Sequence, residues 1–139
     1  MIDHVSIAVA DLAASAAFYD AVLGPLGLTK LVDRSPATIG FGKKYPEFWL
    51  NFRESLAPQP DTTGIHICLR ASSEDAVREF FDAAIARGGK SAGDPGPRQA
   101  AFTTYFGAFI FDDDGNKIEA VFFPQMLGKG GGAEGTTSA

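Results

Sequence analysis

The feature that most constrains this chain is a strand–helix unit that occurs twice. In the first copy, residues 2–10 are rich in β-branched side chains, and Asp11 then stands where a helix N-cap is expected. A second such stretch begins 62 residues later, and the same offset relates His4 to His66, Phe18 and Tyr19 to Phe80 and Phe81, and Gly27 to Gly89. Because an internal repeat indicates one structural unit used twice, we expect two related halves.

Hydrophobic patterning predicts the same element order in both halves. In the first half it predicts a strand over 2–10, a helix over 11–23, and strands over 28–34, 38–42 and 47–53. In the second half it predicts a strand from Ile65 and a helix from about Ser73 to Arg87, with Ser72 and Asp75 as a capping box. A short strand and then a long loop follow over 90–101, and the half ends with strands over 103–111 and 117–123 around a turn at 112–116. Each half is therefore βαβββ, which predicts an α+β fold.

The expected organisation is one domain over residues 1–124, with modules at about 1–56 and 63–124, followed by a mobile Gly-rich tail over 125–139. The net charge of −5 and pI near 4.9 disfavour a nucleic-acid partner. No apolar run approaches the ~20 residues needed to span a bilayer, and the N-terminus lacks the basic region of a signal peptide. One cysteine, Cys68, rules out an internal disulfide and fits a cytoplasmic location.

Three polar residues on separate predicted strands suggest a metal site. Glu119 lies in the apolar run from Ile118 to Phe123, where a carboxylate needs a cation or a hydrogen-bond donor. Lys117, on the same face of the strand, is the plain candidate partner. With His4 and His66, Glu119 instead makes a set of two imidazoles and one carboxylate, which can hold a divalent ion and leave coordination positions open.

Several motifs in sequence order carry a family resemblance. They are Ile2–Val5, Phe18–Tyr19, the Gly24–Gly27 turn, Gly64–Ile67, and Asp112–Glu119, which is similar to D-P-D-G-N-x-I-E with Asp113 where Pro is usual. Over residues 1–124 the chain resembles the vicinal oxygen chelate superfamily, which includes glyoxalase I, bleomycin- and fosfomycin-resistance proteins and extradiol dioxygenases. The resemblance implies two βαβββ modules in a cupped, partly closed mixed sheet with the helices outside, and a homodimer. It also implies a divalent metal ion (Fe, Zn, Mn or Ni) on His4, His66 and Glu119.

One position departs from glyoxalase I, which usually adds a carboxylate ligand on the last strand of the first half. Asn51 is the plausible counterpart of Glu119 there, and an amide is a poor metal ligand beside a carboxylate. The three-ligand set is closer to the extradiol dioxygenases, which are usually longer chains. Glyoxalase I activity is therefore the weaker expectation.

Four further residues are candidates for contact with a substrate. Tyr105 is a candidate catalytic acid or hydrogen-bond donor, and Arg98, expected in the long loop, is a candidate clamp for a carboxylate or phosphate. Trp49 and Asn51 are candidates for lining a pocket. Each has a plainer alternative as a core, rim or solvated residue. The run Asp112–Asp114 is expected to form a plain turn rather than a calcium site, and Cys68 a small core residue.

Two main functions follow, and a third alternative stays open. The first is a metalloenzyme that chelates neighbouring oxygens of a small organic substrate, with lyase, isomerase or dioxygenase chemistry and with Glu119 and Tyr105 as catalytic residues. The second, implied by the bleomycin-resistance branch, is a non-catalytic protein that sequesters a small ligand, with dimerisation completing the site. The third is a metal-free member in which the triad is vestigial.

Overall fold

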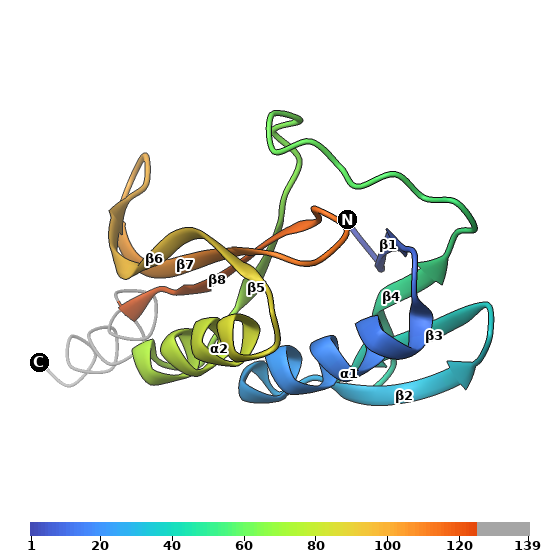
Figure 1. The fold of residues 1–139 in the computed structure, drawn as a ribbon. Helices are drawn as coiled ribbons and strands as arrows, with labels where there is room; N and C mark the ends of the chain where they lie inside the picture. The colour runs from blue at the N-terminus through green and yellow to red at the C-terminus, as the bar shows by residue number, and fades with distance from the viewer. Residues whose placement is uncertain (125–139) are drawn as a thin grey trace, which may run out of the picture.

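The computed structural model describes residues 1–124, so the predicted mobile tail at 125–139 lies outside the described residues. The first half of the chain comprises β1 (Val5–Val9), α1 (Leu12–Leu23), the short 3-10 helix η1 (Gly24–Leu26), β2 (Thr29–Arg34), β3 (Thr38–Gly42) and β4 (Pro46–Phe52). The second half comprises β5 (Ile67–Arg70), α2 (Glu74–Ala86), β6 (Lys90–Gln99), β7 (Thr104–Phe111) and β8 (Lys117–Phe122) (Figure 1). Both halves have the order βαβββ, so the predicted α+β class is confirmed.

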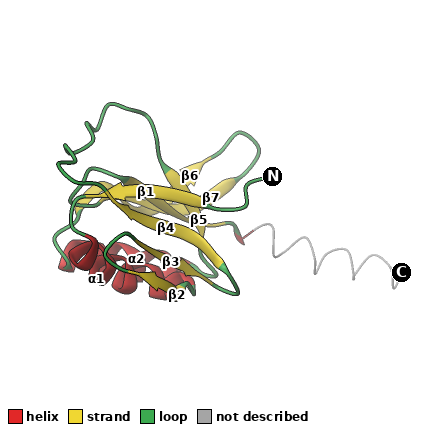
Figure 2. Cartoon of the chain, turned by 90° about the vertical axis from the view of Figure 1, so that its right-hand side faces the viewer, coloured by secondary structure: helices red, strands yellow, loops and turns green. Residues whose placement is uncertain are grey.

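Each half forms its own four-stranded mixed sheet. The strand orders are β1-β4-β3-β2 in sheet A and β5-β8-β7-β6 in sheet B, and in each sheet the first strand runs parallel to the last. Both sheets are open rather than closed. The two helices lie next to each other and cover one side of the sheets, as Figures 1 and 2 show. His4 and His66 each immediately precede the first strand of their module, as the 62-residue repeat predicts.

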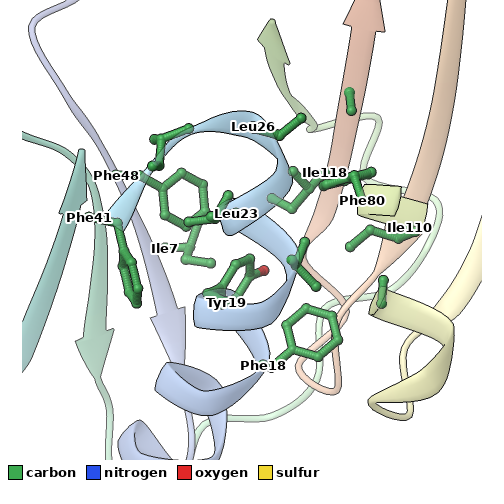
Figure 3. Packing of buried hydrophobic residues seen from close by; sticks show 14 of the residues in the cluster. Ile7, Phe18, Tyr19, Leu23, Leu26, Phe41, Phe48, Phe80, Ile110 and Ile118 are labelled. Atoms are coloured by element: carbon green, nitrogen blue, oxygen red, sulfur yellow. The ribbon is translucent and has the colours of Figure 1, made fainter. Parts of the chain in front are cut away.

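One apolar core joins the two modules. It is built from side chains that point toward the helices on alternate strand positions, such as Ile7 on β1, Phe48 on β4 and Ile118 on β8, together with Tyr19 and Phe80 from the helices (Figure 3). Because strand residues alternate between faces, the neighbours of these core residues are placed on the opposite face of each sheet. That alternation is what sets the candidate site residues apart from the core.

The N-terminal ends of α1 and α2 can be compared with the two N-caps predicted from the sequence. Asp11 caps α1 as predicted, since its Oδ1 accepts a hydrogen bond of 3.0 Å from the backbone N–H of Ala14. The predicted capping box at Ser72 is wrong. Ser73 is the N-cap of α2, because its extended backbone lets Oγ accept from the N–H of Ala76, three residues on, at 3.0 Å.

The predicted long loop over 90–101 is also wrong, because β6 runs the full ten residues from Lys90 to Gln99, antiparallel to β7. The strand contains Pro95 and Pro97, which favoured a loop in the sequence. It lies at the edge of sheet B, where a missing N–H is tolerated, and its register with β7 shifts on either side of Gly93. Arg98 therefore lies on a strand and not in a loop.

The turn between β7 and β8 ties the two modules together. Asp112, which is buried, accepts hydrogen bonds from the Tyr19 hydroxyl at 2.7 Å, from Asn116 Nδ2 at 2.9 Å, and from the backbone N–H groups of Asp114 and Asn116. Asn116 Nδ2 also donates to the carbonyl of Ala8 at 3.0 Å. We call Tyr19, Asp112 and Asn116 the inter-module clasp. It also explains why Asp112–Asp114 forms a turn, as predicted.

Burial sets the protonation behaviour of the clasp. It raises the pKa of Asp112, and the hydrogen bonds from Asn116 and Tyr19 oppose that rise by favouring the carboxylate. Burial, followed by the negative charge of Asp112, raises the pKa of Tyr19 well above its ordinary value, so the phenol keeps its proton and stays a donor. The clasp therefore has a defined donor, Tyr19, and a defined acceptor, Asp112.

The linker between the modules is seated on the same turn. The backbone N–H of Gln59 donates to the carbonyl of Asp114 at 2.7 Å. Gly115 has a φ of 81°, and a Cβ there would collide with the carbonyl of Gln59. Only glycine satisfies both the backbone conformation and this close approach.

Removing the clasp donor is expected to destabilise the whole chain. Tyr19→Phe keeps the buried ring but removes one hydrogen bond to a buried carboxylate, which we expect to lower the free energy of unfolding by about 1–3 kcal/mol. Urea unfolding followed by circular dichroism measures the change. The matched control is Tyr45→Phe, whose exposed hydroxyl makes only long contacts to Asp3, and which should change stability by less than about 0.5 kcal/mol. Equal stability of the two variants would contradict the role assigned to the clasp.

Candidate functional site

Sheet B has a polar face that points away from α2, and we call it the site face. It carries Cys68 on β5, Glu119 on β8 and Phe109 on β7, which are paired side by side in register. Glu119 thus sits between a thiol on one neighbouring strand and an aromatic ring on the other. His66, just before β5, and Tyr105, on β7, complete the surroundings of the carboxylate.

Glu119 is nearly fully buried, with 4% of its surface exposed, and both of its oxygens have partners. Oε1 lies 3.4 Å from His66 Nε2, and Oε2 accepts a hydrogen bond of 3.2 Å from the Tyr105 hydroxyl. Lys117, the plain partner considered from the sequence, does not pair with it. The Lys117 ammonium lies 4.9 Å from the centre of the Phe109 ring instead. The structure therefore brings together His66, Glu119 and Tyr105.

The His66 ring is held on one side and open on the other. Its edge packs against Phe109, with ring centres 5.5 Å apart, and about 40% of its side chain is exposed. An imidazole beside a buried carboxylate with one open side is an arrangement that suits binding of a ligand or an ion.

His4 lies apart from this group. Its Nδ1 is 2.7 Å from Asp3 Oδ1, and its side chain is about half exposed. His4 and His66 both line one pocket of about 520 Å³, which Glu47 and Arg70 also border. Within residues 1–124 of this single chain, no three His, Cys, Asp or Glu side chains gather closely enough to hold a metal ion.

Trp49 and Asn51 belong with His4 rather than with Glu119. They lie on β4 in sheet A, paired with Ser6 and Ala8 of β1. The Asn51 amide oxygen accepts a hydrogen bond of 2.8 Å from the Thr38 hydroxyl, and Trp49 is half-buried. The candidate residues therefore divide into two half-sites: His4, Trp49 and Asn51 on sheet A, and His66, Glu119, Tyr105 and Arg98 on sheet B.

The site face also contains cations and aromatic rings that sequence reasoning missed or only partly used. Arg98 lies 5.2 Å from the centre of the Phe109 ring, and Arg70 lies 5.4 Å from that of Phe123. Tyr105 packs on Phe123 with ring centres 5.2 Å apart. The period-two spacing of Lys117 and Glu119, and of Tyr105 and Phe109, was the available signal, but the pairing of their strands was needed to bring them together.

The carboxylate shifts the acidities around it. Burial first, and then the charge and hydrogen bonding of Glu119, raise the pKa of the Cys68 thiol to about 12. The same causes raise the pKa of Tyr105 above its ordinary value, so its hydroxyl keeps its proton at neutral pH. Cys68, expected as a small core residue, is exposed.

A model of the Glyoxalase/Bleomycin resistance protein/Dioxygenase superfamily matches residues 1–120. The chain therefore belongs to that superfamily, and the resemblance found in its motifs is confirmed.

Solved structures agree with this assignment. The chain is similar to a glyoxalase/bleomycin resistance protein from Albidiferax ferrireducens, with 31% identity, a TM-score of 0.74, and coverage of 86% of this chain and 96% of that one. A fosfomycin resistance protein, FosX, from Listeria monocytogenes shares the fold, with 19% identity, a TM-score of 0.62, and coverage of 87% of this chain and 91% of that one. None of the curated proteins searched matches the chain. None of the helices within residues 1–124 has the length and apolar character to cross a bilayer.

The raised pKa of Cys68 gives a chemical prediction for chelator-treated protein. At pH 8 a thiol with a pKa of about 12 is thiolate in roughly one molecule in ten thousand, so alkylation by iodoacetamide should be at least ~100-fold slower than in the unfolded chain. The unfolded chain is the reference because unfolding removes both the burial and the Glu119 charge that raise the pKa of this thiol. Glu119→Gln removes a neighbouring charge and should speed the reaction, whereas Glu47→Gln should not. Equal rates in folded and unfolded protein would refute the prediction.

Proposed function

We propose that this chain is a metal-dependent enzyme that acts on a small organic molecule. In this proposal His66 and Glu119 are two ligands of a divalent ion, and Tyr105 is the hydrogen-bond donor that orients Glu119. The observation that carries the proposal is the buried carboxylate of Glu119 facing the half-open imidazole of His66. Membership of the superfamily supports it.

The donor set fits a divalent ion. Imidazole nitrogen and carboxylate oxygen are ligands that Zn, Mn, Ni and ferrous iron accept. Two donor atoms about 2.1 Å from a tetrahedral ion lie about 3.4 Å apart. His66 Nε2 and Glu119 Oε1 are separated by 3.4 Å, which matches that spacing without any side-chain movement.

We propose His4 as the third ligand, supplied by a second copy of the chain in a homodimer. The two half-sites lie on different sheets, and among the described residues β1 and β5 each pair with only one strand. A second copy would bring the His4, Trp49 and Asn51 half-site to the His66 and Glu119 half-site. We keep as part of this proposal the single domain at 1–124, with modules at 1–56 and 63–124, and a cytoplasmic location.

When bound, the ion would act as a Lewis acid toward neighbouring oxygens of the substrate. The residues of the chain do the rest. The Tyr105 hydroxyl, which keeps its proton at neutral pH, donates to Glu119 Oε2 and fixes the carboxylate. Phe109 packs on His66 and limits rotation of the imidazole. A substrate on the site face would thus meet ligands that are held in place before it arrives.

One observation favours a second function, a metal-free binding protein. Glu119 already has two partners within one chain, so its burial is compensated without an ion. In that case the aromatic rings of Phe109 and Phe123 would hold a planar ligand, and His66 would only position Glu119. Metal content separates the two functions.

Metal analysis of protein purified without chelators tests the first function. Wild-type protein is expected to retain about one divalent ion per chain, and Glu119→Gln, which keeps the shape of the side chain, should weaken metal affinity by at least ~10-fold. The matched control is Glu47→Gln, a carboxylate that borders the same pocket as His66 but lies in sheet A. Wild-type protein without metal affinity, or a Glu119→Gln variant with normal affinity, would leave the metal-free function.

The origin of the third ligand can be tested by mixing two defective variants. His4→Ala and Glu119→Gln should each lose metal affinity. If the ligands come from two copies, a refolded equal mixture contains mixed dimers with one intact site, and about a quarter of the wild-type metal content should return. No recovery, in a mixture shown to contain mixed dimers, would place His4 with the other ligands of its own chain or remove it from the site.

A further inference from the structure

We propose that Asp3 is a positioning residue for His4. Its carboxylate holds the proton of the imidazole on Nδ1, so that Nε2 is the free donor atom that a metal ion would use. This inference rests on the proposed function for one point, the assignment of His4 as a metal ligand. It applies equally whether His4 serves its own chain or a second copy.

The contact with Asp3 sets which nitrogen of the His4 ring carries the proton. His4 Nδ1 lies 2.7 Å from Asp3 Oδ1. An ionised carboxylate can only accept, so Nδ1 of a neutral imidazole must be the donor, and Nε2 then carries the lone pair. Nε2 has no hydrogen-bond partner within the part of the chain that the structure describes. The ring is therefore left with one free acceptor atom.

Asp3 is itself held by a residue from a distant part of the chain. The Tyr45 hydroxyl lies 3.3 Å from the carbonyl oxygen of Asp3 and 3.5 Å from its Oδ2, while Oδ1 faces His4. The negative charge of Asp3 is the largest cause that raises the pKa of Tyr45, so the phenol keeps its proton and remains a donor. Each oxygen of the carboxylate thus has its own partner.

The pairing of two strands brings Tyr45 to Asp3. Because β1 and β4 run parallel with Val5 opposite Phe48, the residues just before the two strands are neighbours. The turn that carries Tyr45 closes tightly at Gly42, where a Cβ would overlap with the carbonyl oxygen of Tyr45. Glycine is therefore required for this turn, and the turn delivers the hydroxyl to Asp3.

The two histidines of the repeat are supported in different ways. The 62-residue offset matches Asp3 with Ile65, so no carboxylate precedes His66. His66 instead packs on Phe109 and faces Glu119. His4 is about half exposed and has no ring packed on it among the described residues, so the contact with Asp3 is what orients its imidazole. A carboxylate bound to the far nitrogen of a histidine ligand fixes the tautomer and raises the basicity of the ligand atom.

Nitrogen-15 NMR of the metal-free, full-length protein labelled in its histidines tests the tautomer directly. The chain has two histidines, so His4→Gln assigns both sets of signals. At a pH where both imidazoles are neutral, His4 is expected to be mainly in the Nδ1–H form. Asp3→Ala should return it to the tautomer distribution of the urea-unfolded chain, and Asp3→Asn, which keeps a weaker acceptor, should lie between the two.

His66 in the same spectra is the internal control, because it does not contact Asp3 and should not change in either variant. A merely structural role of Asp3 would alter the melting temperature without changing the tautomer of His4. Wild-type protein in which His4 has the distribution of the unfolded chain would overturn the inference, and so would a folded Asp3→Ala variant with an unchanged His4 tautomer.

Titration with Zn²⁺ tests the consequence for metal binding. Asp3→Ala should weaken zinc affinity by at least ~10-fold and Asp3→Asn by less, because the amide oxygen still accepts from Nδ1. The matched control is Glu47→Gln, which removes a negative charge from the same pocket without a contact to the imidazole and should stay within about twofold of wild type. Equal zinc affinity of Asp3→Ala and wild type would overturn the role of Asp3 toward the metal ion.

The two measurements separate this inference from the proposed function. Protein that binds no zinc but shows the Asp3-dependent Nδ1–H form of His4 would contradict the proposed function and leave the positioning role of Asp3 intact. Protein that loses zinc affinity in His4→Gln but not in Asp3→Ala would support the proposed function and contradict this inference alone.

Discussion

The buried carboxylate of Asp112 fixes the position of one module against the other. It accepts a hydrogen bond from the Tyr19 hydroxyl of α1, and Asn116 of the same turn donates to the carbonyl of Ala8 on β1. A buried carboxylate is tolerated only where donors surround it. Four donors meet at Asp112, and one of them comes from the other module. The relative placement of the sheets therefore depends on a few directional bonds as well as on the shared apolar core.

The placement of the two sheets determines which candidate residues lie close together within one chain. His66, Glu119 and Tyr105 are joined through neighbouring strands of sheet B, so their geometry follows from strand pairing alone. His4, Trp49 and Asn51 follow sheet A. The same βαβββ unit, used twice, gives one group of candidate residues on each sheet, and His4 and His66 from the two groups line the same pocket. The repeat thus accounts for the architecture and for the presence of one histidine just before the first strand of each module.

The sequence predicted what depends on local pattern. Strand alternation and Asp11 placed the first strand and helix, and the repeat paired His4 with His66. It failed where context overrides propensity: Pro95 and Pro97 suggested a loop, but edge position and register shifts at Gly93 allow a strand. Ser72 and Ser73 are equally good cap residues, and only the backbone selects Ser73. The separation of His4 from Glu119 depends on how the modules pack, and the buried partnership of Tyr19 with Asp112 spans 93 residues. No local pattern contains either.

The hydrogen bond between Gln59 and the β7–β8 turn constrains the linker that joins the two modules. The linker between the modules is held near its middle by a backbone hydrogen bond from Gln59 to Asp114, and the close approach of the two segments requires glycine at position 115. The linker is therefore divided into two short segments, one on each side of Gln59. As long as this hydrogen bond is kept, a change in linker length on one side of Gln59 has to be accommodated by the residues on that side alone.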